Sequence, residues 1–350
     1  MTRTRLALPA LLLAALAACT GSTEAPAPGA AAPTATTAAT LVLGAYTTPR
    51  EAFGKAILPA FTAKWKADKQ QDLTVQESYQ GSGAQSRAVI GGFEADVVQL
   101  SLDPDVDKIA AAGLITHDWR AGEHAGIVTE SIVVLAVREG NPKGIKDWAD
   151  LARADVVVVT PNVKTSGGAM WNVAAIHGAA LRGHIAGVAA NDPAAAEDFL
   201  SKVIQNVKVM DKSGRESLVT FENGVGDVAI TYENEVLVAR KEGQKMDYVV
   251  PSSTILIEMP VAVVDTYATK HGTTELANAF VAYLFTPDAQ KAFAEYGYRP
   301  VDHTLTPAAL PVPADQFTVR DLGGWGELQK ALFAKDAAYD RALGKAGGDR

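Results

Sequence analysis

Short apolar runs and longer segments of mixed polarity alternate along the chain from residue 41 onward. The apolar runs have the length of buried strands, and they cover residues 41–46, 73–78, 95–100, 156–159, 207–210 and 227–232. The segments between them are rich in helix formers and carry helix-start signals, such as Thr286 followed by Pro287. This alternation of strand and helix predicts an α/β fold with a mostly parallel sheet.

Two longer β runs stand apart from the others, at residues 131–138 and 255–264. We expect them to pair with each other and to cross between two lobes. Residues 41–130 together with 258–350 then form lobe 1, and residues 131–257 form lobe 2. Each lobe is expected to hold a mixed, mostly parallel sheet flanked by helices.

Three helical segments carry further signals. A helix is expected from Pro49 to about Lys66, and Pro59 should kink or divide it because proline removes a backbone donor. Trp171 is expected on the buried face of a helix that follows the strand at 156–159. The tail at 321–343 is amphipathic and is expected to be helical.

Four of the predicted strands are followed by a short loop rich in Ser, Thr and Gly and then by a helix. The loops contain Thr47, Ser82, Ser166-Gly167-Gly168 and Ser213-Gly214. The first N–H groups of a helix have no partner inside it, and the helix dipole favours negative charge at that end. An ordinary helix cap explains any one of these loops equally well. Four loops of the same kind at the carboxyl ends of strands predict a site where backbone N–H groups surround an anion.

The N-terminus has the pattern of an export signal. Arg3 and Arg5 form a positive region, and residues 6–16 form an apolar stretch that is too short to span a membrane. The stretch ends in Leu-Ala-Ala before Cys19, the only cysteine of the chain, and this resembles the lipobox of bacterial lipoproteins. We therefore expect a signal peptide at 1–18 and a lipid on Cys19; an ordinary secretory signal is the alternative. Residues 19–40 have the composition of a disordered tether.

Charge and composition exclude several classes of protein. The formal net charge is −8, and removal of the leader makes it more negative, so no nucleic-acid partner is expected. Six histidines are scattered without ligand spacing, so no metal site is expected. Any anion site must be local, built from dipoles and donors, because the overall field repels anions.

Enzyme signatures are also missing from the sequence. The segment 224–229 has the form GxGxxA but precedes a strand, which is the wrong context for dinucleotide binding. There is no GxxxxGK[ST] phosphate loop and no GxSxG nucleophile elbow. We expect no cofactor and no catalysis; a sulfate- or phosphate-ester hydrolase, the alternative from another class, needs a nucleophile or metal ligands around the site.

The segment from about residue 41 to residue 343 resembles the periplasmic sulfate- and thiosulfate-binding proteins of ABC importers. The matching stretches are residues 46–51, 81–85, 94–96, 138–142, 161–172, 226–235 and 298–300. The resemblance implies a two-lobe periplasmic-binding-protein fold of type II that holds its ligand in the cleft between the lobes. It also implies a monomer that sits at the outer face of the cytoplasmic membrane or in the periplasm and delivers its ligand to permease subunits.

The resemblance implies which groups contact the anion. Backbone N–H groups of Thr47, Ser82, Gly167, Gly168 and Gly214 donate, as does the hydroxyl of Ser166. Tyr232 stands where sulfate binders of the family have a tryptophan donor, and a plain core aromatic is its alternative interpretation. Thr47 and Gly214 also depart from the residues common in the family.

The implied ligand is sulfate, with thiosulfate next and then molybdate or phosphate. A site made only of donors suits sulfate, which carries no proton at neutral pH, whereas the proton of hydrogen phosphate would stay unpaired at a cost of about 1–3 kcal/mol. Glu233 and Asp211 lie next to contact positions, and either carboxylate would admit phosphate if it turned inward. Arg50 and Arg215 are expected to support the loops from behind.

Overall fold

The computed structural model describes residues 38–347 of the chain. The predicted signal peptide, Cys19 and nearly all of the predicted tether lie outside the described residues. None of the described helices is long and apolar enough to cross a membrane.

Eleven strands form one mixed sheet within the described residues. They are β1 Ala39–Tyr46, β2 Leu73–Gln80, β3 Val97–Gln99, β4 Ile127–Arg138, β5 Val158–Pro161, β6 Val207–Asp211, β7 Val228–Tyr232, β8 Met246–Val249, β9 Ser253–Val263, β10 Arg299–Pro300 and β11 Asp315–Phe317. The main path of the sheet runs β2-β1-β3-β9-β4-β7-β5-β6. Strands β2, β1 and β3 are parallel to one another, and so are β7, β5 and β6. The predicted mixed α/β arrangement is therefore confirmed; five of the ten strand pairings among the described residues are parallel, and β4 makes four of the five antiparallel ones.

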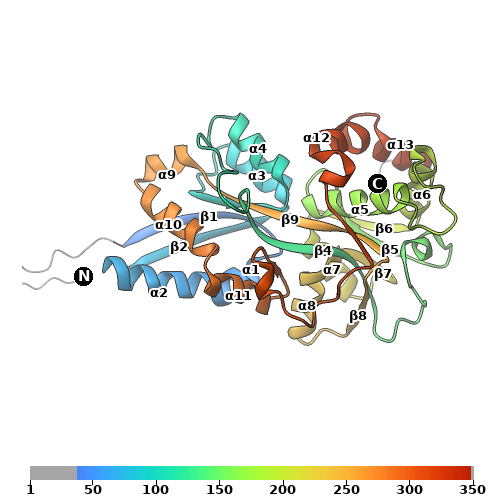
Figure 1. Ribbon diagram of the computed structural model, residues 1–350, viewed down its shortest axis with the longest axis horizontal. Helices are drawn as coiled ribbons and strands as arrows, with labels where there is room; N and C mark the ends of the chain where they lie inside the picture. Colours follow the sequence, from blue (N-terminus) through green and yellow to red (C-terminus); the bar gives the residue numbers. More distant parts are fainter. Residues whose placement is uncertain (1–37, 348–350) are drawn as a thin grey trace, which may run out of the picture. The chain divides into compact units, whose positions relative to one another are not determined.

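The two long β runs are the centre of this sheet. Strands β4 and β9 pair antiparallel, with Ser131 opposite Ile257 and Ile132 opposite Leu256. They connect the part of the sheet built from β1, β2 and β3 with the part built from β5, β6 and β7 (Figure 1). All but one of the twelve residues of β4 are buried, so both faces of the strand are covered. This explains why its sequence is a continuous apolar run without alternation.

Helices cover the sheet on both sides of this central pair (Figure 1). They are α1 Arg50–Ala52, α2 Leu58–Lys69, α3 Ser82–Ile90, α4 Asp103–Ala111, α5 Gly167–Leu181, α6 Pro193–Gln205, α7 Gly214–Glu222, α8 Glu233–Lys241, α9 Asp265–His271, α10 Thr274–Leu284, α11 Pro287–Glu295, α12 Gly324–Leu328 and α13 Ala338–Lys345. The predicted cap of α11 is present, because the Thr286 hydroxyl accepts from the N–H of Ala289.

The helix predicted at 49–66 is divided, as its proline suggests. A short π-helical segment, Phe53–Ile57, separates α1 from α2, and Pro59 lies in the first turn of α2. The backbone stays helical through this segment, since Ala52, Ile57 and Leu58 all have right-handed helical dihedrals. The π-helical turn before Pro59 thus accommodates the proline without ending the helix.

The tail is not the single helix that its pattern predicts. It consists of α12, the π-helical segment Gln329–Phe333 and α13. Gly323 and Gly324 both have positive φ and separate the 3-10 turn Arg320–Leu322 from α12, and the chain turns again at Asp336, whose φ is also positive. The broken tail allows α13 to pack against α6, and Trp325 packs edge-on against Trp171 with ring centroids 4.8 Å apart.

Candidate functional site

Three of the predicted loops are in direct contact. The N–H of Ala84 donates to the Thr165 carbonyl at 3.3 Å, and the Thr165 hydroxyl donates to the Lys212 carbonyl at 2.7 Å. A Cβ built on Gly81 would lie 2.5 Å from the Thr165 oxygen and 2.7 Å from the Lys212 oxygen. Only glycine permits this approach, so Gly81 fixes the spacing between the loops.

The loop that contains Thr47, the fourth of the predicted loops, lies beside the other three. A Cβ built on Gly214 would lie 3.8 Å from the methyl carbon of Thr48, which follows the half-buried Thr47. The Thr48 hydroxyl is 3.0 Å from the Tyr298 hydroxyl, and Thr48 is buried. We call the segments 47–48, 81–82, 165–168 and 212–214 the donor loops.

Three helices begin at the donor loops, namely α3 at Ser82, α5 at Gly167 and α7 at Gly214. The first N–H groups of each helix lack acceptors within that helix, and the dipoles add partial positive charge. Gly167, Gly168 and Gly214 carry no Cβ that would keep a ligand away from these N–H groups. The site therefore offers several donors and a local positive potential without requiring a lysine or arginine.

The serines of the donor loops use their hydroxyls differently. The Ser213 hydroxyl accepts from the N–H of Glu216 at 3.2 Å, which is an ordinary helix cap. The Ser82 hydroxyl donates to Asp105 at 2.7 Å and accepts from the N–H of Ser101 at 3.0 Å. Ser166 makes no side-chain cap although it occupies the cap position of α5. Its hydroxyl is thus available, whereas Ser82 can offer a ligand only its backbone N–H.

Tyr232 closes the site between two of the helix ends. Its ring carbon Cε2 lies 2.8 Å from a Cβ built on Gly168 and 3.3 Å from one built on Gly214. The Tyr232 hydroxyl is 2.7 Å from the Ser101 hydroxyl, and both residues are buried. Burial raises the pKa of Tyr232 well above its ordinary value, so the phenol stays neutral and retains its hydrogen.

All seven residues that the sequence singled out lie at these loops. They are Thr47, Ser82, Ser166, Gly167, Gly168, Gly214 and Tyr232; six are buried and Thr47 is half-buried. Sequence reasoning missed Ser101, whose hydroxyl lies 2.6 Å from a Cβ built on Gly167. A signal was present, because Ser101 stands between β3 and α4 and repeats the strand–hydroxyl–helix pattern of the other loops.

Arg215 holds two of the loops together from behind. Its guanidinium donates two hydrogen bonds of 2.7 Å to Glu51, close after the Thr47 loop, and bonds of 2.7 and 2.8 Å to the buried Glu235. Burial alone would lower the pKa of Arg215, but the two carboxylates raise it well above its ordinary value. The guanidinium is thus always charged, and four of its five N–H groups donate to carboxylates. Arg50, the other expected support, lies with its guanidinium carbon 4.8 Å from the centre of the Tyr79 ring.

The two carboxylates next to the site are engaged elsewhere. Glu233 accepts from Arg299 at 2.8 and 3.1 Å, and Asp211 accepts from the Thr220 hydroxyl at 3.1 Å. Both oxygens of Glu233 are thus occupied by Arg299, whereas Oδ2 of Asp211 is buried without a hydrogen-bond partner among the described residues. Among the described residues, no group of three or more His, Cys, Asp or Glu could hold a metal ion.

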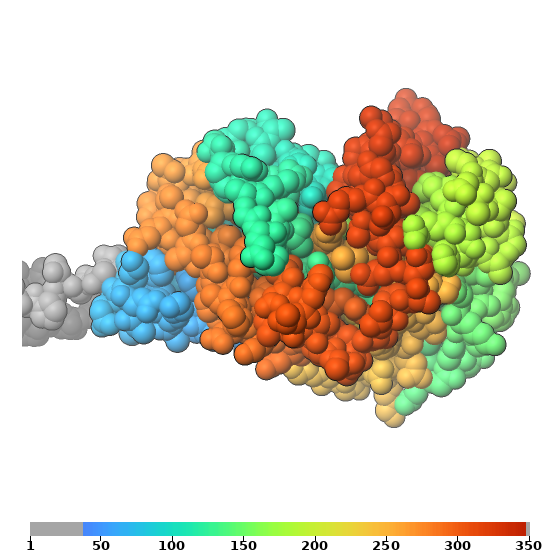
Figure 2. Space-filling model, in the orientation of Figure 1, coloured from blue at the N-terminus to red at the C-terminus, as the bar shows by residue number. Residues whose placement is uncertain are grey.

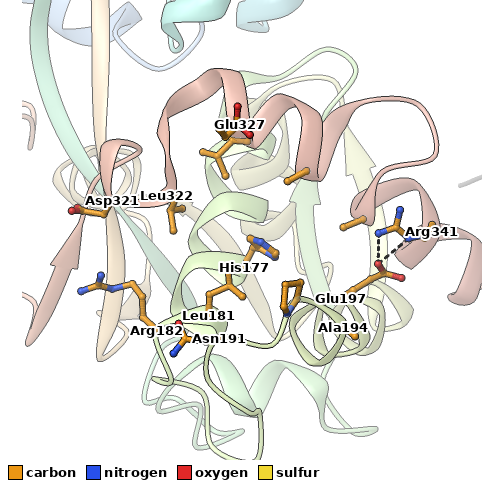
Figure 3. A pocket seen from close by; sticks show the side chains of 14 residues that line it. His177, Leu181, Arg182, Asn191, Ala194, Glu197, Asp321, Leu322, Glu327 and Arg341 are labelled. Carbon is orange, nitrogen blue, oxygen red and sulfur yellow. Dashed lines mark hydrogen bonds and ion pairs between the residues drawn. The ribbon is translucent and has the colours of Figure 1, made fainter.

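Two hollows lie away from the donor loops. One of about 950 Å³ lies between α5, α6 and the tail, where His177 and Leu181 face the segment that carries Glu327, beside the Glu197–Arg341 ion pair (Figure 3). Burial lowers the pKa of His177 to about 4, so this imidazole is neutral near pH 7. The other, of about 580 Å³, lies between residues 103–127 and the tail, and Figure 2 shows the groove beside the red tail. Neither lining includes a residue of the donor loops.

Comparisons with known proteins find relatives that are similar to this chain over most of its length. A sulfate-binding protein of Synechococcus elongatus is 42% identical over 331 residues, which cover 93% of this chain and 91% of that one. A sulfate-binding protein of Escherichia coli is 43% identical over 291 residues, or 81% of this chain and 86% of that one. A thiosulfate-binding protein of Escherichia coli is 35% identical and covers 87% and 90% of the two chains.

A solved structure and a family profile complete the comparison. The structure of the sulfate-binding protein SubI from Mycobacterium tuberculosis superposes with a TM-score of 0.77 at 38% identity, and it covers 84% of this chain and 99% of that one. The fold is thus the predicted periplasmic-binding-protein fold, a mixed sheet flanked by helices. The family described as bacterial extracellular solute-binding protein matches residues 41–299. The chain belongs to this family of extracellular solute-binding proteins.

Proposed function

We propose that this protein captures sulfate between the donor loops and delivers it to the permease of an ABC importer. One observation carries the proposal: the N-termini of α3, α5 and α7 converge where Tyr232 and Ser101 meet. The relatives named for sulfate at 42% and 43% identity support the choice of ligand.

The chemistry of the donor loops favours a fully deprotonated anion. The groups they present are backbone N–H groups and hydroxyls. The neighbouring carboxylates have other partners: Asp105 accepts from the Ser82 hydroxyl, Glu233 from Arg299, and Oδ1 of Asp211 from Thr220. Hydrogen bonds to a charged group are worth roughly 1.5–3 kcal/mol each, so six or seven can offset the dehydration of a dianion. Sulfate brings no proton, and every donor therefore meets an acceptor.

Capture and release require the loops to separate. We propose that two lobes, residues 41–130 with 258–350 and residues 131–257, move about the β4–β9 pair in a hinge motion. The hydrogen bond from the Trp171 indole to the Ser101 carbonyl, 2.8 Å long, then forms only when the lobes close. The permease would then recognise the ligand-bound protein by its closed form.

The family description supports export of the chain. We propose that Cys19 carries the lipid that holds the protein at the outer face of the membrane and that the protein acts as a monomer. A multiply acylated cysteine anchors stably, whereas a single chain binds a membrane only marginally.

Thiosulfate is the second candidate, because a relative of 35% identity is named for it and the anion is also tetrahedral and unprotonated. Calorimetric titration of the full chain with sulfate, thiosulfate, molybdate and phosphate tests the assignment. We expect sulfate to bind most tightly, with one site per chain. Tighter binding of thiosulfate than of sulfate would make thiosulfate the assigned ligand. Turnover of a sulfate or phosphate ester would contradict the assignment of the protein as a solute-binding protein.

A further inference from the structure

We propose that the hollow of about 950 Å³ between α5, α6 and the tail is a second ligand site, which takes a small uncharged organic molecule with an apolar body and a carbonyl oxygen. We call this space the tail hollow. Its lining includes no residue of the donor loops, so the inference does not depend on sulfate binding. Its size lies within the range of about 300–1,000 Å³ that is usual for small-molecule sites.

Small side chains keep the tail hollow open between α6 and the tail. Ala194 in α6, Ala331 in the π-helical segment Gln329–Phe333 and Ala338 in α13 all line it. Close-packed protein interiors leave few voids larger than a water molecule. Short π-helical segments inside helical stretches occur often at functional sites. The tail thus borders a space that its own side chains do not fill.

His177 gives the tail hollow a polar group without a partner. The residue is only 6% exposed, and its Nδ1 is buried with no hydrogen-bond partner among the described residues. Figure 3 shows its ring among the side chains that line the hollow. Buried N–H groups without a partner are rarer than acceptors without one, so we place the hydrogen on Nε2. Nε2 can then donate to an oxygen of a ligand.

The charges around the tail hollow are already paired, which favours an uncharged ligand. Burial lowers the pKa of His177 to about 4, so its imidazole is a neutral donor near pH 7. Glu197 accepts from Arg341 at 2.6 Å. The other charged groups of the lining also have partners: Arg182 bonds to Asp315, Glu327 to Lys330, and Asp321 to the N–H of Thr318. A charged ligand would lose water here without meeting a free opposite charge.

Apolar side chains complete the wall beside the imidazole. Leu181 in α5 and Leu322 and Leu328 in the tail line the same space. An apolar wall with one polar group that fixes orientation is the usual design of a small-molecule site. The tail hollow therefore suits a ligand that buries an apolar ring and directs one acceptor oxygen toward His177.

The test uses three soluble compounds with the same ring, namely cyclohexanone, cyclohexanecarboxylate and cyclohexylammonium. Each is titrated at about pH 7 into the full chain labelled with ¹⁵N-histidine, and long-range ¹H–¹⁵N correlations follow both ring nitrogens of His177. In the free protein we expect the hydrogen on Nε2. Cyclohexanone should bind saturably and shift the Nε2 signal, and the two charged compounds should bind at least about tenfold more weakly.

Three variants locate the binding, which is followed by the NMR line widths of the compound itself. His177→Phe keeps an aromatic ring and removes the donor, so cyclohexanone affinity should fall about fivefold. Ala331→Leu fills the hollow and should abolish binding. His124→Phe is the matched control, because His124 lines the other hollow and stacks on Phe285 with ring centroids 5.9 Å apart; its affinity should be unchanged. Thermal midpoints confirm that each variant folds.

Several results would overturn the second site. These are equal affinity for the three compounds, cyclohexanone binding that leaves the His177 signals unmoved, and a ring that carries its hydrogen on Nδ1. Unchanged cyclohexanone binding by Ala331→Leu would also overturn it, because the compound would then lie elsewhere.

Discussion

The indole N–H of Trp171 donates to the backbone carbonyl of Ser101 at 2.8 Å, and both residues are fully buried. Trp171 lies in α5, one turn after the glycines of the donor loop, and Ser101 follows β3. We expect Trp171→Phe to leave this carbonyl unpaired in the closed state, at a cost of about 1–3 kcal/mol. Calorimetry should show sulfate affinity reduced at least fivefold. An unchanged affinity would show that closure does not depend on this bond.

Gly168 lies against Tyr232 with no room for a side chain. A Cβ at this position would be 2.8 Å from the ring, so Gly168→Ala must displace Tyr232 or the helix end. We expect sulfate binding to fall at least tenfold by calorimetry. Gly54→Ala is the matched control, because nothing lies within 4 Å of its built Cβ; it should bind normally and gain about 0.5–1 kcal/mol of stability. Normal sulfate binding by Gly168→Ala would show that Gly168 is not part of the binding site.

Arg215 should contribute strongly to stability, since it joins Glu51 to the buried Glu235. Breaking a buried ion pair from one side costs about 3–5 kcal/mol, and the partial exposure of Arg215 places Arg215→Gln at the lower end of that range. Urea unfolding measures the loss. Lys64→Gln breaks an exposed pair with Asp68 and should cost much less, because water screens the two charges. Equal effects of the two variants would contradict the supporting role of Arg215.

The interactions of His271 should make the stability of the fold depend on pH. Its hydrogen bonds to Asp96 and Glu94 raise its pKa above the ordinary 6.5, so the folded state holds the proton more tightly than the unfolded state. This contribution is fully present below pH 6.5 and is lost as the pH rises through the folded pKa. His271→Gln should therefore lower the thermal midpoint more at pH 5.5 than at pH 9. The same loss at both pH values would show that the imidazole is not charged in the folded protein.

Cys19 carries a prediction of its own. If the residue is acylated, wild-type protein expressed in a bacterium incorporates labelled palmitate and partitions into detergent, whereas Cys19→Ser does neither. Labelling of the serine variant, or an unlabelled wild type, would leave an ordinary secretory signal as the explanation.

The order of strands and helices was predictable because each strand is a short apolar run bounded by helix starts. Strand β8 was missed, since Asp247 interrupts its apolar pattern and the strand is defined by pairing with β4. The tail was predicted as one helix because its amphipathic pattern hides the breaks at Gly323 and Asp336. The division into lobes and the lipid anchor stay predictions.

At the site, helix-start signals identified the donor loops, because each such signal depends only on a few residues that are neighbours in the sequence. The same strand–hydroxyl–helix pattern marks Ser101, but its contact with Tyr232, 131 residues later in the chain, appears only in the fold. The carboxylate of Glu233 shows the same limit, because the sequence could not reveal that Arg299 holds it.

Amide proton shifts of the donor glycines test the central claim most directly. In the full chain labelled with ¹⁵N-glycine, sulfate should move the amide protons of Gly167, Gly168 and Gly214 downfield as they form hydrogen bonds to the anion, whereas Gly54 should not shift. Sulfate that binds without moving these three amides, or that does not bind, would contradict the account.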